Sequence, residues 1–81
     1  MHNDALWRAA KRRPYLVAAL WSGTPAELAA FLGCDEATAI RLGLCRAARP
    51  GEDLAAWAGR IAGQFGLDLE RMRLLAGALA R

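Results

Sequence analysis

The sequence predicts an all-α fold, a compact bundle of about five short helices that forms a single domain over residues 1–81. Apolar residues recur at helical spacing along most of the chain, and residues that start and stop helices separate these stretches. No stretch alternates between apolar and polar residues for long enough to form a strand. Hydrophobic residues make up 56% of the sequence, so the chain has enough apolar material for one modest core.

The N-terminal segment, residues 1–23, is expected to form a kinked or split helix, or arm, that starts at Asn3 or Asp4. Its apolar residues Leu6, Trp7 and Ala10 lie on one side, and Arg8, Lys11 and Arg12 lie largely on another. Pro14 interrupts this helix, because proline lacks a backbone donor and disfavours helical angles at the preceding residue. The apolar stripe then resumes with Leu16, Val17, Leu20 and Trp21, and it ends at Ser22 and Gly23.

The middle of the chain, residues 24–45, predicts two helices joined by a tight turn. Thr24, Pro25 and Glu27 match a capping box with proline at the first helical position, so a helix starts at Pro25. This helix carries Leu28, Phe31 and Leu32, and it stops at Gly33, which suits a left-handed cap. Asp35 can cap a following helix that runs to about Leu44. Its expected inner face is formed by Ala37, Ile40 and Leu44.

Residues 50–80 predict a C-terminal pair of helices. Arg49, Pro50 and Gly51 form a turn, and Glu52 and Asp53 belong to the first turn of the next helix. That helix has the most regular apolar stripe of the chain, formed by Leu54, Trp57, Ala58, Ile61 and Phe65. Gly66 ends it, and Asp68 caps a last helix with Leu67 and Met72 placed as a hydrophobic staple. The last helix adds Leu75, Ala76 and Leu79 to the core.

Neither membrane insertion nor export is predicted. The longest uncharged stretch runs from Pro14 to Ala26 and is broken by polar and turn-forming residues. Arg8, Lys11 and Arg12 stand where a signal peptide needs its apolar segment, so a cytoplasmic location is expected. Eleven basic residues against eight acidic ones give a net charge of +3, which permits nucleic-acid binding without requiring it.

No cofactor, metal or small-molecule substrate is predicted, and we expect no enzyme. Cys34 and Cys45 are the only cysteines and His2 the only histidine, whereas a structural zinc site uses four such ligands. Buried free thiols are the favoured interpretation, and a disulfide is the alternative. Neighbouring acids such as Asp35 and Glu36 stand at helix starts, where capping explains them. There is no glycine-rich phosphate loop and no nucleophile with a plausible base.

Residues 25–35, PAELAAFLGCD, resemble the opening of a helix-turn-helix of the Cro/lambda-repressor (XRE-type) family. Ala29 stands mid-helix where two crossing helices exclude a large side chain, and Gly33 stands at the sharp turn. Residues 61–71, IAGQFGLDLER, are similar to the passage from the fourth to the fifth helix of such domains. The resemblance covers residues 24–79, and it implies a lambda-repressor-like fold and a dimeric DNA-binding transcriptional regulator.

The helix-turn-helix interpretation implies which residues contact duplex DNA. Thr38 and Arg41 face the groove, and Arg46 and Arg49 bind phosphates just beyond the second helix. The alternative is a solvated basic edge that keeps an alanine-rich protein in solution. A second basic cluster, formed by Lys11, Arg12 and Arg13 with Arg8 nearby, would follow the DNA backbone or, again, only be solvated.

The sequence also departs from the family pattern. Cys34, Asp35 and Glu36 stand where such motifs offer an aliphatic residue, a Ser or Thr cap and polar or basic groups, and phosphates would repel the two carboxylates. Ala39 occupies a position that is usually aliphatic, although Ile40 next to it can take over the packing. A second hypothesis follows: a helical protein-interaction module, an accessory or adaptor subunit of a larger bacterial assembly.

Exposed aromatic residues would mark the interface in that second case. Trp57 and Trp21 are expected in the core, whereas Trp7 is expected at its boundary, and an exposed Trp7 beside Tyr15 would form a protein interface.

The charge distribution distinguishes the DNA-binding hypothesis from the protein-interaction hypothesis. One continuous positive face with Arg41, Arg46 and Arg49 favours DNA, and positive patches split by Asp35 and Glu36 favour a protein partner.

Overall fold

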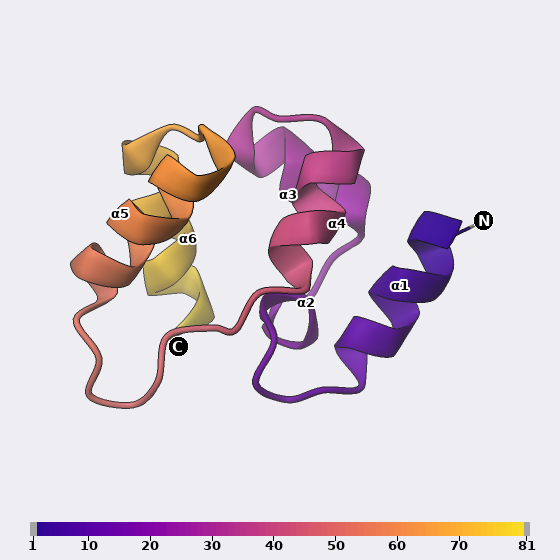
Figure 1. The fold of residues 1–81 in the computed structure, drawn as a ribbon, viewed down its shortest axis with the longest axis horizontal. Helices are drawn as coiled ribbons and strands as arrows, with labels where there is room; N and C mark the ends of the chain where they lie inside the picture. Colours follow the sequence, from indigo (N-terminus) through magenta and orange to yellow (C-terminus); the bar gives the residue numbers. More distant parts are fainter. Residues whose placement is uncertain (1, 81) are drawn as a thin grey trace.

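The computed structural model describes residues 2–80, with side chains from residue 4 onward, and these residues form six α-helices (Figure 1). They are α1 (His2–Lys11), α2 (Val17–Leu20), α3 (Pro25–Leu32), α4 (Glu36–Gly43), α5 (Leu54–Phe65) and α6 (Leu69–Leu79). The predicted all-α bundle is confirmed, and the sixth helix arises because the first predicted helix is split in two. α5 packs mainly on α6 and α3 mainly on α4, while α1 and α2 both pack on α4.

Pro14 divides the N-terminal segment as predicted. α1 ends at Lys11, and α2 is a single turn that starts at Val17. The Lys11 ammonium group donates hydrogen bonds to the carbonyl oxygens of Trp21 (3.0 Å) and Ala18 (3.5 Å). Lys11 therefore satisfies carbonyl groups at the end of α2 and fixes α2 against α1.

The expected boundary position of Trp7 is wrong, because only 6% of this residue is exposed. The indole lies on Gly43 of α4, where an added Cβ atom would stand 2.5 Å from Trp7 Cζ3 and 3.2 Å from Ala18 Cβ. A glycine here thus makes room for the largest side chain of α1. Trp7 is part of the core and is removed from the possible interface.

The capping signals of the middle segment are confirmed. The Thr24 hydroxyl accepts the Glu27 N–H (3.1 Å), and the Glu27 carboxylate accepts the Thr24 N–H (2.9 Å), which completes the capping box of α3. Gly33 ends α3 with φ 70°, in the left-handed region. The Asp35 carboxylate accepts the Thr38 N–H (2.8 Å) and caps α4.

The predicted inner face of α4 is partly wrong. Ile40 is buried as expected, but Ala37 is exposed and 40% of Leu44 is exposed. The buried face is instead formed by Ala39, Ile40, Leu42 and Gly43. The difference arises because α4 contacts helices on two sides, α3 on one and α1 with α2 on the other, so its apolar face is broader than one stripe.

The C-terminal pair agrees with the prediction except at its start. Glu52 and Asp53 precede α5 rather than forming its first turn, and Asp53 caps it by accepting the N–H groups of Ala55 (2.9 Å) and Ala56 (3.3 Å). Gly66 ends α5 with φ 67°, and Asp68 caps α6. Trp57 is buried as expected.

One core runs through all six helices, and its buried members include Val17, Leu28, Leu32, Ile40, Leu42, Trp57, Met72 and Leu75. Trp21 is only half-buried, and its ring meets Phe31 edge-on at 5.7 Å. Cys34 and Cys45 are free and half-buried rather than fully buried, and burial raises the pKa of both thiols. Among the described residues, no helix is long and apolar enough to cross a membrane.

Candidate nucleic-acid interface

The helices α3 and α4 are joined by a tight turn, as the family resemblance implies. Ala29 is buried, and its carbonyl oxygen accepts the N–H groups of Gly33 and Cys34, so the chain reverses within three residues. Arg71 of α6 covers the turn: its guanidinium donates to the Phe31 carbonyl oxygen (3.4 Å), and a Cβ atom at Gly33 would lie 2.8 Å from Arg71 Nη1. The turn is therefore fixed by its own backbone and by the last helix.

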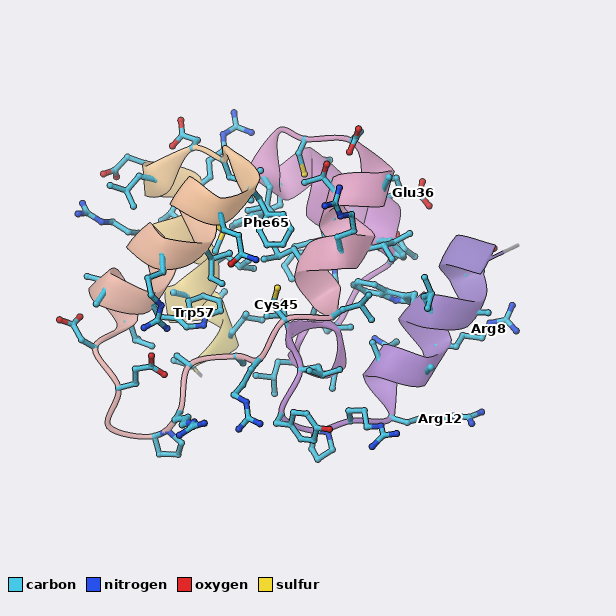
Figure 2. All side chains as sticks on the ribbon, in the orientation of Figure 1. Arg8, Arg12, Glu36, Cys45, Trp57 and Phe65 are labelled. Atoms are coloured by element: carbon cyan, nitrogen blue, oxygen red, sulfur yellow. The ribbon has the colours of Figure 1, made fainter. Side chains whose placement is uncertain are left out.

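The beginning of α4 is acidic. Asp35 and Glu36 are both exposed there, and Figure 2 shows Glu36 at the upper end of the helix. Hydrogen bonds from the Thr38 hydroxyl and N–H groups, with a smaller effect of the Arg41 charge, lower the pKa of Asp35. Thr38 is half-buried and bonded to this cap, and Arg41 is close enough to Asp35 to act on its charge. Thr38 is thus bonded to the acidic cap, whereas Arg41 belongs to the last turn of α4.

A different surface carries several basic side chains, beyond the other end of α4. The segment before α2 and the segment after α4 are joined by an isolated bridge between Leu16 and Arg46. In it Val17 N–H donates to the Cys45 carbonyl (2.9 Å) and Ala47 N–H donates to the Tyr15 carbonyl (2.9 Å). This pairing unites two basic clusters that are separate in the sequence.

We call this surface the basic edge and define it by Arg12, Arg13, Tyr15, Arg46 and Arg49. The Arg46 guanidinium carbon lies 5.2 Å from the centre of the Tyr15 ring, and 47% of Tyr15 is exposed. Arg49 shares a hollow with Pro14 and Tyr15. Figure 2 shows Arg12 at the lower end of α1. Within the described residues, no carboxylate forms an ion pair with any of the four arginines.

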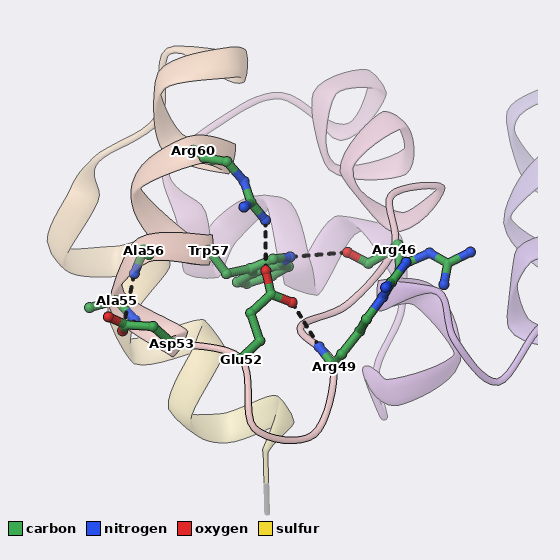
Figure 3. Close-up of polar contacts among 8 residues, drawn as sticks. All are labelled: Arg46, Arg49, Glu52, Asp53, Ala55, Ala56, Trp57 and Arg60. Carbon is green, nitrogen blue, oxygen red and sulfur yellow. Dashed lines mark hydrogen bonds and ion pairs between the residues drawn. The ribbon is translucent and has the colours of Figure 1, made fainter.

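A second hollow lies on the other side of Arg46 and Arg49, between residues 44–53 and α5 (Figure 3). Glu52 stands in it and accepts the Arg49 N–H (2.9 Å) and an N–H of the Arg60 guanidinium (2.9 Å). The hydrogen bond from the Arg49 backbone, followed by that from Arg60, lowers the pKa of Glu52. Trp57 Nε1 donates to the Arg46 carbonyl (3.0 Å), so the segment that carries both arginines is held at two points.

The structure therefore groups the predicted residues differently from the sequence interpretation. Arg46 and Arg49 line one hollow together with Pro14 and Tyr15, whereas Arg41 lies in the last turn of α4 and lines neither hollow. Lys11 is exposed yet bonded to carbonyl groups of its own chain.

Sequence reasoning missed the pair formed by Glu52 and Arg60. Glu52 lies before the cap of α5 and Arg60 lies within the helix, so the pair forms because the segment before α5 folds back along it. No periodic pattern in the sequence indicates this contact.

Comparison with protein-family models, with curated proteins and with solved structures finds no match to this chain.

Proposed function

We propose that the chain is a small DNA-binding protein of the helix-turn-helix type, a cytoplasmic transcriptional regulator that holds the phosphate backbone of duplex DNA through the basic edge. The observation that carries the proposal is the bridge between Leu16 and Arg46, which joins the segment that follows Arg12 and Arg13 to the segment that carries Arg46 and Arg49. Among the described residues, none of these four arginine side chains forms an ion pair with a carboxylate, although the Arg49 charge acts on Glu52. Guanidinium groups bind phosphate through two parallel donors, so this surface has suitable chemistry.

The acidic start of α4 alters the expected binding mode. In the Cro/lambda-repressor arrangement the N-terminal residues of the second helix approach base edges, and here Asp35 and Glu36 occupy that place. Repulsion from phosphates disfavours an approach by this end of α4. We therefore expect phosphate contacts to supply most of the affinity, with modest discrimination between sequences.

Binding of a fluorescent duplex across a salt series tests the proposal. If all four arginines of the basic edge neutralise phosphates, log K should fall against log salt with a slope of about −3.6. Arg46→Gln and Arg49→Gln should each make the slope about one unit shallower. Arg73→Gln is the matched control, because Arg73 lies on α6 in an exposed ion pair with Glu70. The proposal is overturned if the wild-type chain does not bind at low salt or if the control changes the slope as much.

A second candidate is the protein-interaction module, and one observation favours it: the two carboxylates at the start of α4, Asp35 and Glu36, are both exposed. The exposed acidic start of α4 would then face a basic partner, while the burial of Trp7 leaves only Tyr15 of the two expected interface aromatics. Co-purification from native cells tests this. A stoichiometric companion lost with Glu36→Lys but kept with Glu70→Lys supports the module, and recovery of the chain alone contradicts it.

A further inference from the structure

We propose that the hollow between residues 44–53 and α5 is a phosphate-binding subsite, and that the Glu52 carboxylate occupies its donors when no phosphate is bound. This inference deepens the proposed function and rests on it for the expected ligand, a phosphate of the DNA backbone. The same chemistry would also accept a free phosphate group.

The donors of the hollow are those that bind phosphate elsewhere. Glu52 accepts one backbone N–H, from Arg49, and one guanidinium N–H, from Arg60, each at 2.9 Å. Backbone N–H groups and arginine side chains hold carboxylates and phosphates in the same way, through short charge-assisted hydrogen bonds. A carboxylate held by these two donors therefore indicates where an oxygen of a phosphate group would be bound.

The charge balance of the hollow favours an added anion. Its lining includes Arg46, Arg49 and Arg60 against the carboxylate of Glu52. Asp53, the next acid along the chain, accepts N–H groups at the start of α5 and does not line the hollow. The Arg60 guanidinium bonds to Glu52 and the Arg49 charge acts on it, whereas the Arg46 guanidinium lies over Tyr15 (Figure 3). Two positive charges against one carboxylate leave an excess of one positive charge, which favours an added anion.

The shape of the hollow also admits the ligand. Its volume is about 540 Å³, and buried Trp57 lies at its wall with Nε1 bonded to the Arg46 carbonyl. The Arg60 side chain is 64% exposed and that of Glu52 is 27% exposed, so both can move when a phosphate binds. Glu52 has to leave the Arg49 N–H and the Arg60 guanidinium before a phosphate can accept hydrogen bonds from them. Glu52 thus competes with phosphate and weakens the subsite.

The first test compares two carboxylates that each pair with one arginine. Glu52→Gln keeps an oxygen acceptor for the Arg49 N–H and removes the charge, and we expect duplex DNA to bind about threefold more tightly at constant salt. Glu70→Gln is the matched control, because it makes the same change in net charge beside Arg73 on α6. Equal effects of the two substitutions would overturn the proposal. Arg60→Gln should weaken binding and cancel the gain from Glu52→Gln, whereas Arg73→Gln should do neither.

The second test identifies the source of the phosphate by NMR. Inorganic phosphate is titrated into the full chain at constant ionic strength, with the Trp57 indole N–H and the Arg60 side chain as reporters, and a short duplex is titrated separately. Saturable shifts of both reporters with inorganic phosphate support a site for free phosphate groups as well, and shifts with the duplex alone support a backbone subsite. If neither ligand moves the reporters, the subsite is wrong. The proposed DNA binding is then judged separately, by the effect of Arg46→Gln on the salt slope.

Discussion

The two ends of α4 differ in charge, in burial and in the elements that hold them. The first end is exposed and acidic, and its capping bonds come from within its own turn, where Asp35 accepts the Thr38 N–H. The C-terminal end of α4 is buried at Gly43, where the Trp7 ring covers it. The segment that follows contains Arg46, which forms the bridge with Leu16. The helices α3 and α4 are thus joined by a tight turn with an acidic start of α4, while the basic edge lies beyond the other end of α4.

This contrast teaches that the scaffold and the binding surface depend on different residues. The turn between α3 and α4 is held by the Ala29 carbonyl, by the left-handed conformation of Gly33 and by the covering Arg71. The basic edge depends on two segments outside that helix pair, which meet only because α1 and α2 pack on α4. Substitutions in α4 should therefore affect the stability of the fold and the binding of DNA separately.

The largest expected effect comes from the side chain that anchors α4 in the core. Leu42 is fully buried, so Leu42→Ala should lower the free energy of unfolding by about 3 kcal/mol through lost burial and a cavity. Leu44→Ala is the control, because 40% of Leu44 is exposed, and it should cost less than about 1 kcal/mol. Urea unfolding of both variants measures the difference. Equal losses would mean that Leu44 belongs to the inner face after all.

A smaller effect should follow from disturbing only the last end of α4. Gly43→Ala places a methyl group against the Trp7 ring and Ala18, and overpacking should cost about 1–3 kcal/mol. Gly59→Ala, in α5 with open space around it, should instead stabilise the fold by about 0.5–1 kcal/mol because alanine favours helix. Thermal unfolding of the pair measures both signs. A neutral Gly43→Ala would show that Trp7 adjusts without cost.

The sequence was sufficient where the determining contacts are local. Thr24, Asp35 and Asp68 each bond to backbone groups within three residues, so their caps could be predicted from spacing. Gly33 and Gly66 ended helices where the apolar pattern stopped.

The features that could not be predicted from the sequence are contacts between residues that are distant in the chain. Trp7 is buried because it meets Gly43, and the basic edge exists because Leu16 pairs with Arg46. Periodicity along one helix says nothing about which other helix covers it, and an arginine-rich neighbourhood of Trp7 suggested exposure for that reason. The sequence therefore predicted which residues would form the candidate site, but not the surface on which they lie.

The charge contrast between the ends of α4 can be tested directly by two arginines. Arg46→Gln should weaken duplex binding by about threefold to tenfold at moderate salt, because it removes a phosphate contact of the basic edge. Arg41→Gln should weaken binding less, because Arg41 lies in α4 and outside the basic edge. Anisotropy titrations at matched ionic strength compare them. A larger loss with Arg41→Gln would move the DNA contact back to α4.

The smallest expected effect is a pH dependence that comes from the caps rather than from the core. Hydrogen bonding, chiefly by Thr38 for Asp35 and by Thr24 for Glu27, lowers the pKa of both carboxyls in the folded chain. A carboxyl of this kind stabilises the fold above its unfolded pKa of about 4, and the contribution is lost as the pH falls through the lower folded pKa. The free energy of unfolding should therefore decrease as the pH is lowered below about 5.

Asp35→Asn isolates the contribution of the first end of α4. Asparagine caps a helix about as well as aspartate but carries no charge, so the variant should remain folded at neutral pH and lose less stability on acidification than the wild type. Glu36→Gln removes one neighbouring charge without removing a cap, and it corrects for the change in net charge. Unfolding curves between pH 7 and about pH 3 make the comparison. If Asp35→Asn and the wild type lose the same free energy of unfolding on acidification, protonation of Asp35 does not weaken the cap of α4. The start of α4 is then stabilised by its backbone hydrogen bonds alone.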